Sequence, residues 1–162
     1  NWTWYATGPG VGIQTRSGRL VIPCDHYQEG IAGSISHVFF SDDHGATWQL
    51  GGSAPEGTNE SQVVELRDGS LLLNMRSYRG KNRRGVSRSS DGGKTWGDVE
   101  WDSTLIEPVC QASLRLANHL TRRRELVELD STRSAGIVKQ VDRHLNFSSA
   151  DSPVRNPWSC MG

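Results

Sequence analysis

An all-β fold made of repeated units is predicted by three features of this 162-residue sequence. The pattern S-x-D-x-G-x-T-W occurs at Ser41–Trp48 and again at Ser89–Trp96. The spacing of roughly 48 residues falls within the repeat lengths of blade and solenoid proteins. The 18 glycines separate short apolar runs, and no long apolar stripe with a helical period is present. Short antiparallel strands joined by tight turns are therefore expected.

The two copies of this pattern, which we name the Asp boxes, have the composition of a tight turn between strands. The carboxylate can accept hydrogen bonds from nearby backbone N–H groups, and the glycine can adopt a positive φ. The tryptophan is expected to begin the next strand and to pack its ring beneath the turn. We interpret the boxes as scaffold rather than as catalytic groups. The residues with this structural assignment are Asp43, Gly45 and Trp48 in the first box and Asp91, Gly93 and Trp96 in the second.

A second repeat precedes each box. Ile13–Ile22 aligns with Val64–Leu73, and each segment reads as a strand, a glycine turn and an apolar strand. Each unit thus contains a hairpin, a third strand, an Asp box and a fourth strand. Four antiparallel strands in one unit form a blade of a β-propeller.

The expected strands follow from this order. The first blade covers about residues 10–52, with strands at Gly12–Gln14, Leu20–Pro23, Ser36–Ser41 and Trp48–Leu50. The second covers about residues 58–100, with strands at Gln62–Leu66, Leu71–Arg76, Gly85–Ser89 and Trp96–Asp98. A third begins near residue 109, with strands at Gln111–Leu116, Glu125–Asp130 and Ile137–Val141. We assign residues 1–116 to this partial propeller and residues 117–162 to a divergent tail. The tail is either a degenerate third blade or an aberrant end, and its last segment, Ser148–Gly162, is expected to be irregular or disordered.

The number of blades has a direct consequence for closure. Propellers close with about four to eight blades, and two blades with part of a third cannot form a ring. The chain is therefore expected to expose sheet edges and apolar blade faces, and to be a fragment of a larger propeller whose remainder covers them.

The composition excludes several classes of partner and cofactor. Lys plus Arg equals Asp plus Glu at 18 each, so the formal net charge is zero. Nucleic acid and anionic membranes both select a basic excess, and no apolar run reaches membrane-spanning length. Cys24, Cys110 and Cys160 show neither a zinc spacing nor a disulfide framework. No metal, no cofactor and no particular cellular compartment is predicted.

One end of the second hairpin carries a candidate charged site. The hairpin turns at Asp68-Gly69, so Glu60 and Arg76 are expected to lie opposite one another at its far end. A Glu and an Arg in such positions are most often a solvated ion pair worth about 0–1 kcal/mol. A functional role requires that they also face a concave surface.

The first hairpin is expected to bring further polar groups to the same end. It turns at Ser17-Gly18, which places Asp25, His26 and Tyr27 at the equivalent end, beside Pro9-Gly10. If the first strands of the blades line a central channel, these residues and the Glu60–Arg76 pair collect at one mouth of it.

Several segments, in order and in approximate spacing, resemble exo-α-sialidases. The resemblance covers about residues 2–114. Asp boxes also occur in other propellers, so the motifs around Glu60 and Arg76 are what make the resemblance specific to this family. The segments that carry it are Tyr5–Gly10, Arg19–Pro23, the two Asp boxes, Asn59–Glu65, Leu73–Ser77 and Ile106–Ser113.

The resemblance implies a six-bladed propeller that removes terminal sialic acid from glycans with retention, through a tyrosine nucleophile. Glu60 matches the glutamate that acts as a base toward this tyrosine, whose phenol has an ordinary pKa near 10. Arg76 matches one of three arginines that bind the substrate carboxylate. Asp25 and Tyr27 match residues that line the sugar pocket, and His26 and Glu107 are weaker candidates.

The sequence also departs from the sialidase pattern. The family requires two further arginines, an acid/base aspartate and the nucleophilic tyrosine, which are expected in blades before residue 1 and after residue 162. None of Tyr5, Tyr27 and Tyr78 occupies the nucleophile's motif. We therefore predict a sialidase fragment that cannot hydrolyse sialosides alone. The alternatives are a non-catalytic Asp-box segment that binds glycans or a protein partner, and a truncated product without function.

Asn59-Glu60-Ser61 also fits the acceptor pattern for N-glycosylation. A glycan on Asn59 would lie beside the proposed base. Either this acceptor is unused or the host does not glycosylate the chain.

Overall fold

The computed structural model describes residues 1–80, 82–118, 124–130 and 138–140, and its regular elements are twelve strands. Every pairing between these strands is antiparallel. The described ranges contain no helix long and apolar enough to cross a membrane. Most of the predicted tail, including residues 148–162, lies outside the described residues.

The first sheet contains the first Asp box. Its order is β1-β3-β4-β5, with the short β2 also paired to β3. The strands are β1 (Trp2–Thr7), β2 (Ile13–Gln14), β3 (Leu20–Gln28), β4 (Ser34–Ser41) and β5 (Gln49–Ser53). Strand β1 was not expected from the sequence, and β3 extends five residues beyond its predicted end.

Strand β3 continues past Pro23 because two different strands share one of its edges. β2 pairs with Leu20 and Val21, β1 pairs from Cys24 onward, and Pro23 lies at the break between them. The carbonyl of Pro23 accepts from Gly8 N at this edge, so the nitrogen that lacks a hydrogen faces the break. On this edge, Asp25, His26 and Tyr27 consequently pair with β1 and not with Pro9-Gly10 as expected, while β4 pairs with them on the other edge.

The second sheet has the order β6-β7-β8-β9 and contains the second Asp box. Its strands are β6 (Thr58–Glu65), β7 (Leu71–Ser77), β8 (Arg83–Ser89) and β9 (Glu100–Ile106). The fourth strand was predicted at Trp96–Asp98 and instead begins at Glu100. Trp96 precedes this strand, and its indole Nε1 donates to Gly52 O of the first sheet.

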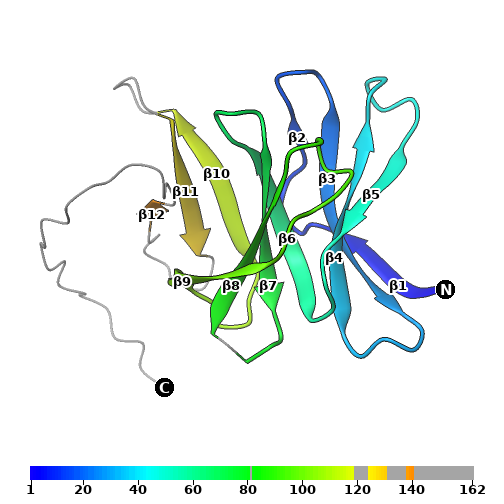
Figure 1. The fold of residues 1–162 in the computed structure, drawn as a ribbon, viewed down its shortest axis with the longest axis vertical. Coiled ribbons are helices and arrows are strands. Elements are labelled where there is room, and N and C mark those ends of the chain that lie inside the picture. The colour runs from blue at the N-terminus through cyan, green and yellow to red at the C-terminus, as the bar shows by residue number, and fades with distance from the viewer. Residues whose placement is uncertain (81, 119–123, 131–137, 141–162) are drawn as a thin grey trace, which may run out of the picture.

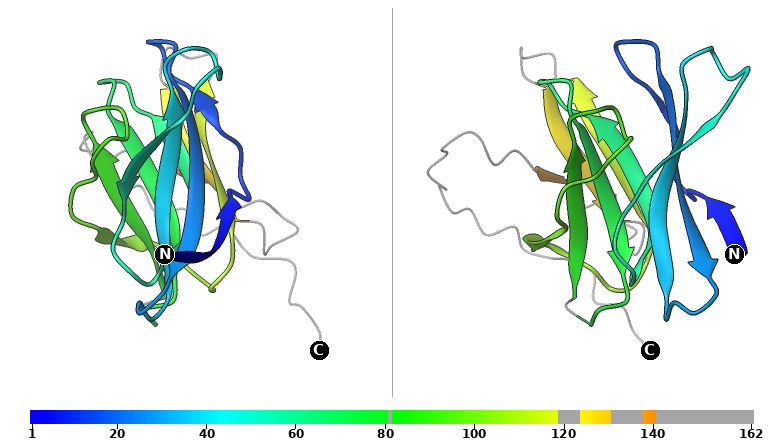
Figure 2. Two further views of the ribbon diagram at one scale, coloured as in Figure 1. Left: turned by 90° about the vertical axis from the view of Figure 1, so that its right-hand side faces the viewer. Right: turned by 45° about the vertical axis from the view of Figure 1, so that its right-hand side comes forward.

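The third sheet has the order β10-β11-β12, at Ala112–Asn118, Arg124–Asp130 and Val138–Gln140. The three sheets lie side by side without closing into a ring, as Figures 1 and 2 show. This arrangement confirms the predicted partial propeller. Strand β6 contacts the first sheet through β3 and the third sheet through β10.

Two hydrophobic clusters join the sheets because successive side chains of a strand point to opposite faces. Val63, Leu71 and Leu73 face the first sheet, whereas Val64 and Leu72 face away from it. The first cluster consists of Val21, Val38, Phe40, Ala54, Val63, Leu71, Leu73 and Met75. The second consists of Val64, Leu72, Val86, Leu105 and Leu114, and so reaches the third sheet.

Each Asp box is closed by hydrogen bonds to its carboxylate. In the first box, Thr47 N and Thr47 Oγ1 donate to Asp43 at 2.8 and 2.6 Å, and Ser41 Oγ donates at 2.7 Å. The second box repeats these bonds at Asp91 with Thr95 and Ser89. The bonds from Thr47 and Ser41 lower the pKa of Asp43 to about 2, and those from Thr95 and Ser89 lower the pKa of Asp91 as well.

The second Asp box attaches the second sheet to the first. Gly52 N donates to Gly93 O at 2.9 Å, and Trp96 Nε1 donates back to Gly52 O at 3.1 Å. Arg19 adds a second link, because it binds both carboxylate oxygens of Asp42 and donates to Gly92 O at 2.9 Å. The two boxes are therefore connected through one guanidinium group.

The first Asp box has no such partner sheet among the described residues. Trp48 is 44% exposed and Leu50 is 55% exposed, whereas Trp96 packs against the first cluster. The outer face of the first sheet therefore leaves large apolar side chains in contact with water, as expected for an incomplete ring.

The contact between β5 and the second box predicts a steric sensitivity at Gly52. A Cβ atom at Gly52 would lie 2.9 Å from both Lys94 O and Trp96 Cδ1, so Gly52→Ala should destabilise the fold by about 1–3 kcal/mol. The control is Gly97→Ala, whose Cβ would meet Arg88 O at an ordinary 3.5 Å. Urea unfolding followed by tryptophan fluorescence measures both, and equal midpoints would contradict this docking geometry.

The lowered pKa values of the boxes predict a loss of stability in acid. Because Asp43 titrates at about 2 when folded and near 4 when unfolded, its bonds add stability above about pH 4 that is lost as the pH falls toward 2. Thermal melts between pH 5 and 2 should show this decline, and Asp43→Asn should make it shallower while leaving the part due to Asp91. Asp98→Asn, which changes an exposed carboxylate outside both boxes, serves as the control.

Candidate functional site

Glu60 and Arg76 form a hydrogen-bonded ion pair at the open end of the β6–β7 hairpin. Arg76 Nη1 donates to Glu60 Oε2 at 2.7 Å, and the two side chains are 21% and 27% exposed. The register shifts between the pairs Thr58–Ser77 and Ser61–Met75, so two residues of β6 oppose Arg76 alone. Such a bulge re-aims side chains, and here it turns Glu60 toward Arg76.

Arg76 retains an unused donor beside this pair. Its Nε atom is buried and has no hydrogen-bond partner among the described atoms. Burial opposes ionisation of the guanidinium, but the hydrogen bond and charge of Glu60 outweigh it and raise the pKa of Arg76. A permanently charged, buried donor without an acceptor favours binding of an anionic group.

Asn59 joins this pair to the first sheet. Its amide Nδ2 donates to Asp25 Oδ2 and to Ser34 Oγ, each at 2.8 Å. Asn59 O accepts from Ser36 Oγ, and Ser36 N donates to the hydroxyl of Thr58. Strands β3, β4 and β6 are thereby tied together by buried polar groups.

Asn59, the acceptor of the N-glycosylation pattern, is buried by the same contacts. The side chain is 5% exposed, and both hydrogen bonds donated by its amide nitrogen are made inside the protein. The folded chain therefore does not expose this amide, and a glycan on Asn59 would be incompatible with the two bonds that its Nδ2 atom makes.

Asp25 is a buried carboxyl group close to the Glu60–Arg76 pair. Burial and the negative charge of Glu60 raise the pKa of Asp25 to about 6, against the opposing effect of Arg76. Asp25 is 1% exposed. A carboxyl that changes protonation near neutral pH in such a cluster is typical of functional sites.

Two tyrosines lie next to the charged groups. Tyr27, at the end of β3, is 37% exposed, and Tyr78, just after β7, is 46% exposed. The guanidinium of Arg76 lies 4.8 Å from the centre of the Tyr78 ring. Burial raises the pKa of the Tyr78 phenol; the charge of Arg76 opposes this rise, and Tyr27, Glu60 and Asp25 add to it. Tyr78 was not assigned from the sequence, although its spacing of two residues places it on the same face of the strand as Arg76.

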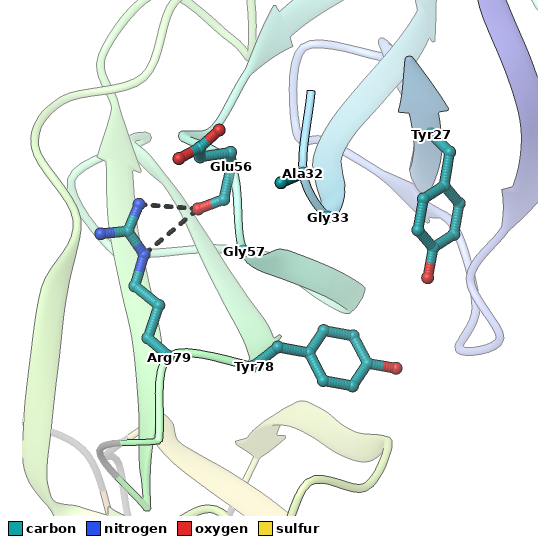
Figure 3. A pocket seen from close by; sticks show the side chains of 7 residues that line it. All are labelled: Tyr27, Ala32, Gly33, Glu56, Gly57, Tyr78 and Arg79. Atoms are coloured by element: carbon teal, nitrogen blue, oxygen red, sulfur yellow. Dashed lines mark hydrogen bonds between the residues drawn. The ribbon is translucent and has the colours of Figure 1, made fainter. Parts of the chain in front are cut away.

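A cavity of 550 Å³ opens beside these tyrosines. Figure 3 shows the Tyr78 side chain directed toward the side on which Tyr27 lies, with Arg79 bonded to the backbone of Glu56. The lining residues are Tyr27, Ala32, Gly33, Glu56, Gly57, Tyr78 and Arg79. Except for Tyr27, the sequence pattern did not single them out, because they come from separate turns.

The two weaker candidates have structural partners. His26 Nδ1 lies 3.0 Å from His37 Nδ1, and the His26 ring stacks on Trp2 at 3.9 Å. Glu107 accepts from Arg84 Nη1 at 2.6 Å in an ion pair whose side chains are each 1% exposed. No group of three or more His, Cys, Asp or Glu side chains in the described part of the chain is arranged to hold a metal ion.

The Asp boxes lie at the opposite end of the sheets from this cluster. The first Asp box begins at Ser41, the last residue of β4, whereas Ser34, the first residue of the same strand, accepts a hydrogen bond from Asn59. Figure 1 shows the β3–β4 and β7–β8 turns at one end and the β4–β5 loop, with its box, at the other. Asp43 and Asp91 therefore do not reach the Glu60–Arg76 pair.

Comparisons with known proteins point to one family. The BNR repeat-like domain family matches residues 1–134. A sialidase of Bacteroides fragilis (strain YCH46) is 37% identical over 115 residues, which cover 70% of this chain and 21% of that protein. A sialidase of Micromonospora viridifaciens is 37% identical over 118 residues, which cover 70% of this chain and 18% of that protein. This chain belongs to the sialidase family.

Solved structures of the family share the fold. The Hadza microbial sialidase Hz136 superposes with a TM-score of 0.73 at 36% identity, over 79% of this chain and 25% of that one. The Trypanosoma rangeli sialidase in complex with sialic acid gives a TM-score of 0.63 at 27% identity, over 77% of this chain and 20% of that one. This chain thus spans about a fifth to a quarter of the length of these relatives.

The raised pKa of Asp25 predicts a measurable coupling to its neighbours. A carboxyl ¹³C NMR titration should show one aspartate with a midpoint near pH 6, absent in Asp25→Asn. Glu60→Gln should move this midpoint down because a negative charge is removed, and Arg76→Ala should move it up.

The control is Arg88→Ala, which removes an exposed positive charge from β8. A midpoint of Asp25 near pH 4 in the unmodified chain would contradict the described cluster. So would a midpoint that is the same in the unmodified chain and in Glu60→Gln.

Proposed function

We propose that this chain is the part of an exo-α-sialidase that supplies Glu60 as a general base and Arg76 as a ligand for the substrate carboxylate. The substrate is the terminal sialic acid of a glycan. The observation that carries the proposal is the Arg76 side chain, which donates from Nη1 to Glu60 while its buried Nε has no partner among the described atoms. The family membership supports the same assignment.

The chemistry requires a base because the family's nucleophile is a tyrosine. A phenol with a pKa near 10 attacks slowly at neutral pH unless a carboxylate accepts its proton. A neutral attacker also avoids repulsion by the carboxylate of the sugar. In Glu60, Oε2 is held by Arg76, and we assign Oε1 to the proton of the tyrosine. The reaction proceeds with retention through a glycosyl-tyrosine intermediate.

Arg76 binds the carboxylate of the substrate and takes no part in bond making or breaking. A guanidinium presents donors in a planar fork that fits a carboxylate, and it stays charged at every physiological pH. Asp25 and Tyr27 line the sugar site, with Asp25 held in place by Asn59. The nucleophilic tyrosine, the acid/base aspartate and two more arginines come from other segments of the propeller, so the isolated chain binds weakly and does not turn over substrate.

Binding and turnover of the purified 162-residue chain test this proposal separately. Saturation-transfer NMR with a methyl α-sialoside should detect millimolar binding that falls at least tenfold in Arg76→Ala, since a lost charge-assisted bond is worth more than about 1.4 kcal/mol. Arg88→Ala should leave binding unchanged. An affinity that is unchanged in Arg76→Ala would overturn the assignment of Arg76 as the ligand for the substrate carboxylate.

A fluorogenic sialoside tests the inactivity of the isolated chain. No release of the fluorophore is expected at any pH between 4 and 8. Turnover by the purified chain that is abolished by Glu60→Gln would show that the chain contains its own nucleophile and would overturn this part of the proposal.

A further inference from the structure

A second buried arginine lies next to Arg76 on the same face of the second sheet. The ladder between β7 and β8 pairs Met75 with Gly85, so the same register continued by one residue places Arg84 across from Arg76. Arg84 Nε donates to Asn74 Oδ1 at 2.6 Å. Asn74 precedes Arg76 by two residues on β7, and side chains two apart on a strand share a face. Two guanidinium groups are therefore neighbours across the two strands.

Glu107, the residue after β9, neutralises the charge of Arg84. Arg84 Nη1 donates to Glu107 Oε2 at 2.6 Å, and both side chains are 1% exposed. Burial lowers the pKa of Arg76, whereas the bond and charge of Glu60 and, with a smaller effect, the charge of Glu107 raise it. The charge of Glu107 thus reaches the guanidinium of Arg76. Each of the two neighbouring guanidinium groups has a carboxylate of its own.

The Arg84–Glu107 pair also holds the turn that leads to β10. Glu107 Oε1 accepts from Cys110 N at 2.8 Å, and Arg84 Nη1 donates to Cys110 O at 2.9 Å. Val109 in this turn has a φ of 62°, a conformation that β-branched residues rarely adopt. The bonds on both sides of Cys110 hold this strained turn in place, which gives the pair a structural role.

Holding a turn does not by itself explain two buried charges. Removing charges from water is costly, and neutral side chains of similar size often replace a buried ion pair without loss of stability. Like charges that face each other across neighbouring strands are destabilising. The negative charge of Glu107 offsets the repulsion between Arg84 and Arg76, which a neutral acceptor in its place could not do.

We infer that Glu107 is a positioning residue that acts through Arg84 and keeps Arg76 and Glu60 bound to each other. The inference rests on the proposed function, in which Glu60 is the base and Arg76 binds the substrate carboxylate. Without the charge of Glu107, two neighbouring guanidinium groups would share one carboxylate. Glu60 would then be drawn away from the position in which its Oε1 accepts the proton of the tyrosine.

The guanidinium NMR signals of Arg76 test this role in the purified 162-residue chain. They are assigned from their absence in Arg76→Lys, and the bond to Glu60 should protect the Nη1 protons from exchange with water. Glu107→Gln keeps the size of the side chain and removes its charge. It should speed this exchange about tenfold, which is the effect of losing one charge-assisted hydrogen bond. Glu107→Asp retains the charge and should keep most of the protection.

A neutral double variant separates the positioning role from the structural one. Combining Arg84→Gln with Glu107→Gln removes both charges, so the protection of the Arg76 protons should return although the turn has lost its carboxylate. A role confined to the turn predicts that both variants lower the melting temperature and that neither changes the exchange at Arg76. The matched control is Glu65→Gln, which breaks the exposed ion pair with Arg16 at the end of β6 and should leave the Arg76 signals unchanged.

If Glu107→Gln does not fold, Arg84→Gln supplies the reciprocal measurement. Glu107 without Arg84 would compete with Glu60 for Arg76 and so speed the same exchange. Arg76 signals that stay unchanged in a folded single variant, with methyl α-sialoside binding still lost in Arg76→Ala, would overturn the inference and leave the proposed function intact. Sialoside binding that does not depend on Arg76 would overturn both.

Discussion

The geometry of the site depends on the side-chain amide of Asn59. It donates to Asp25 of β3 and to Ser34 of β4, while its own backbone belongs to β6. Because Asn59 precedes Glu60 within the bulge, these two bonds fix the second sheet against the first at the residue next to the proposed base. Buried polar networks that are fully bonded specify one arrangement, since any shift would leave a buried group without its partner.

The two ends of the sheets show how one residue type acquires opposite properties. Asp43 lies in an exposed turn where donors surround its carboxylate, and its pKa falls to about 2. Asp25 is buried beside a second carboxylate, and its pKa rises to about 6. Hydrogen bonds to the charged form and loss of solvent act in opposite directions, so the environment of each aspartate, and not its identity, separates scaffold from candidate chemistry.

Features that depend on the register of one hairpin could be predicted from the sequence, whereas features that depend on contacts between distant segments could not. The Glu60–Arg76 pair was predictable because one turn, at Asp68-Gly69, fixes which residues of the hairpin face each other. Strand β1 was not, because no single turn fixes its register: it pairs with β3 beyond a proline, and most of its residues stay exposed. The late start of β9 and the walls of the cavity likewise depend on contacts between segments that no sequence period links.

The glycine pair of β5 limits which strands can receive an Asp box. Gly51 and Gly52 follow the box tryptophan by three and four residues and accept the box of the next sheet, where side chains would collide with it. The corresponding positions after Trp96 are Val99 and Glu100. A strand that receives a box in the way β5 does needs glycine at both positions, and the segment after the second box carries a side chain at each of them.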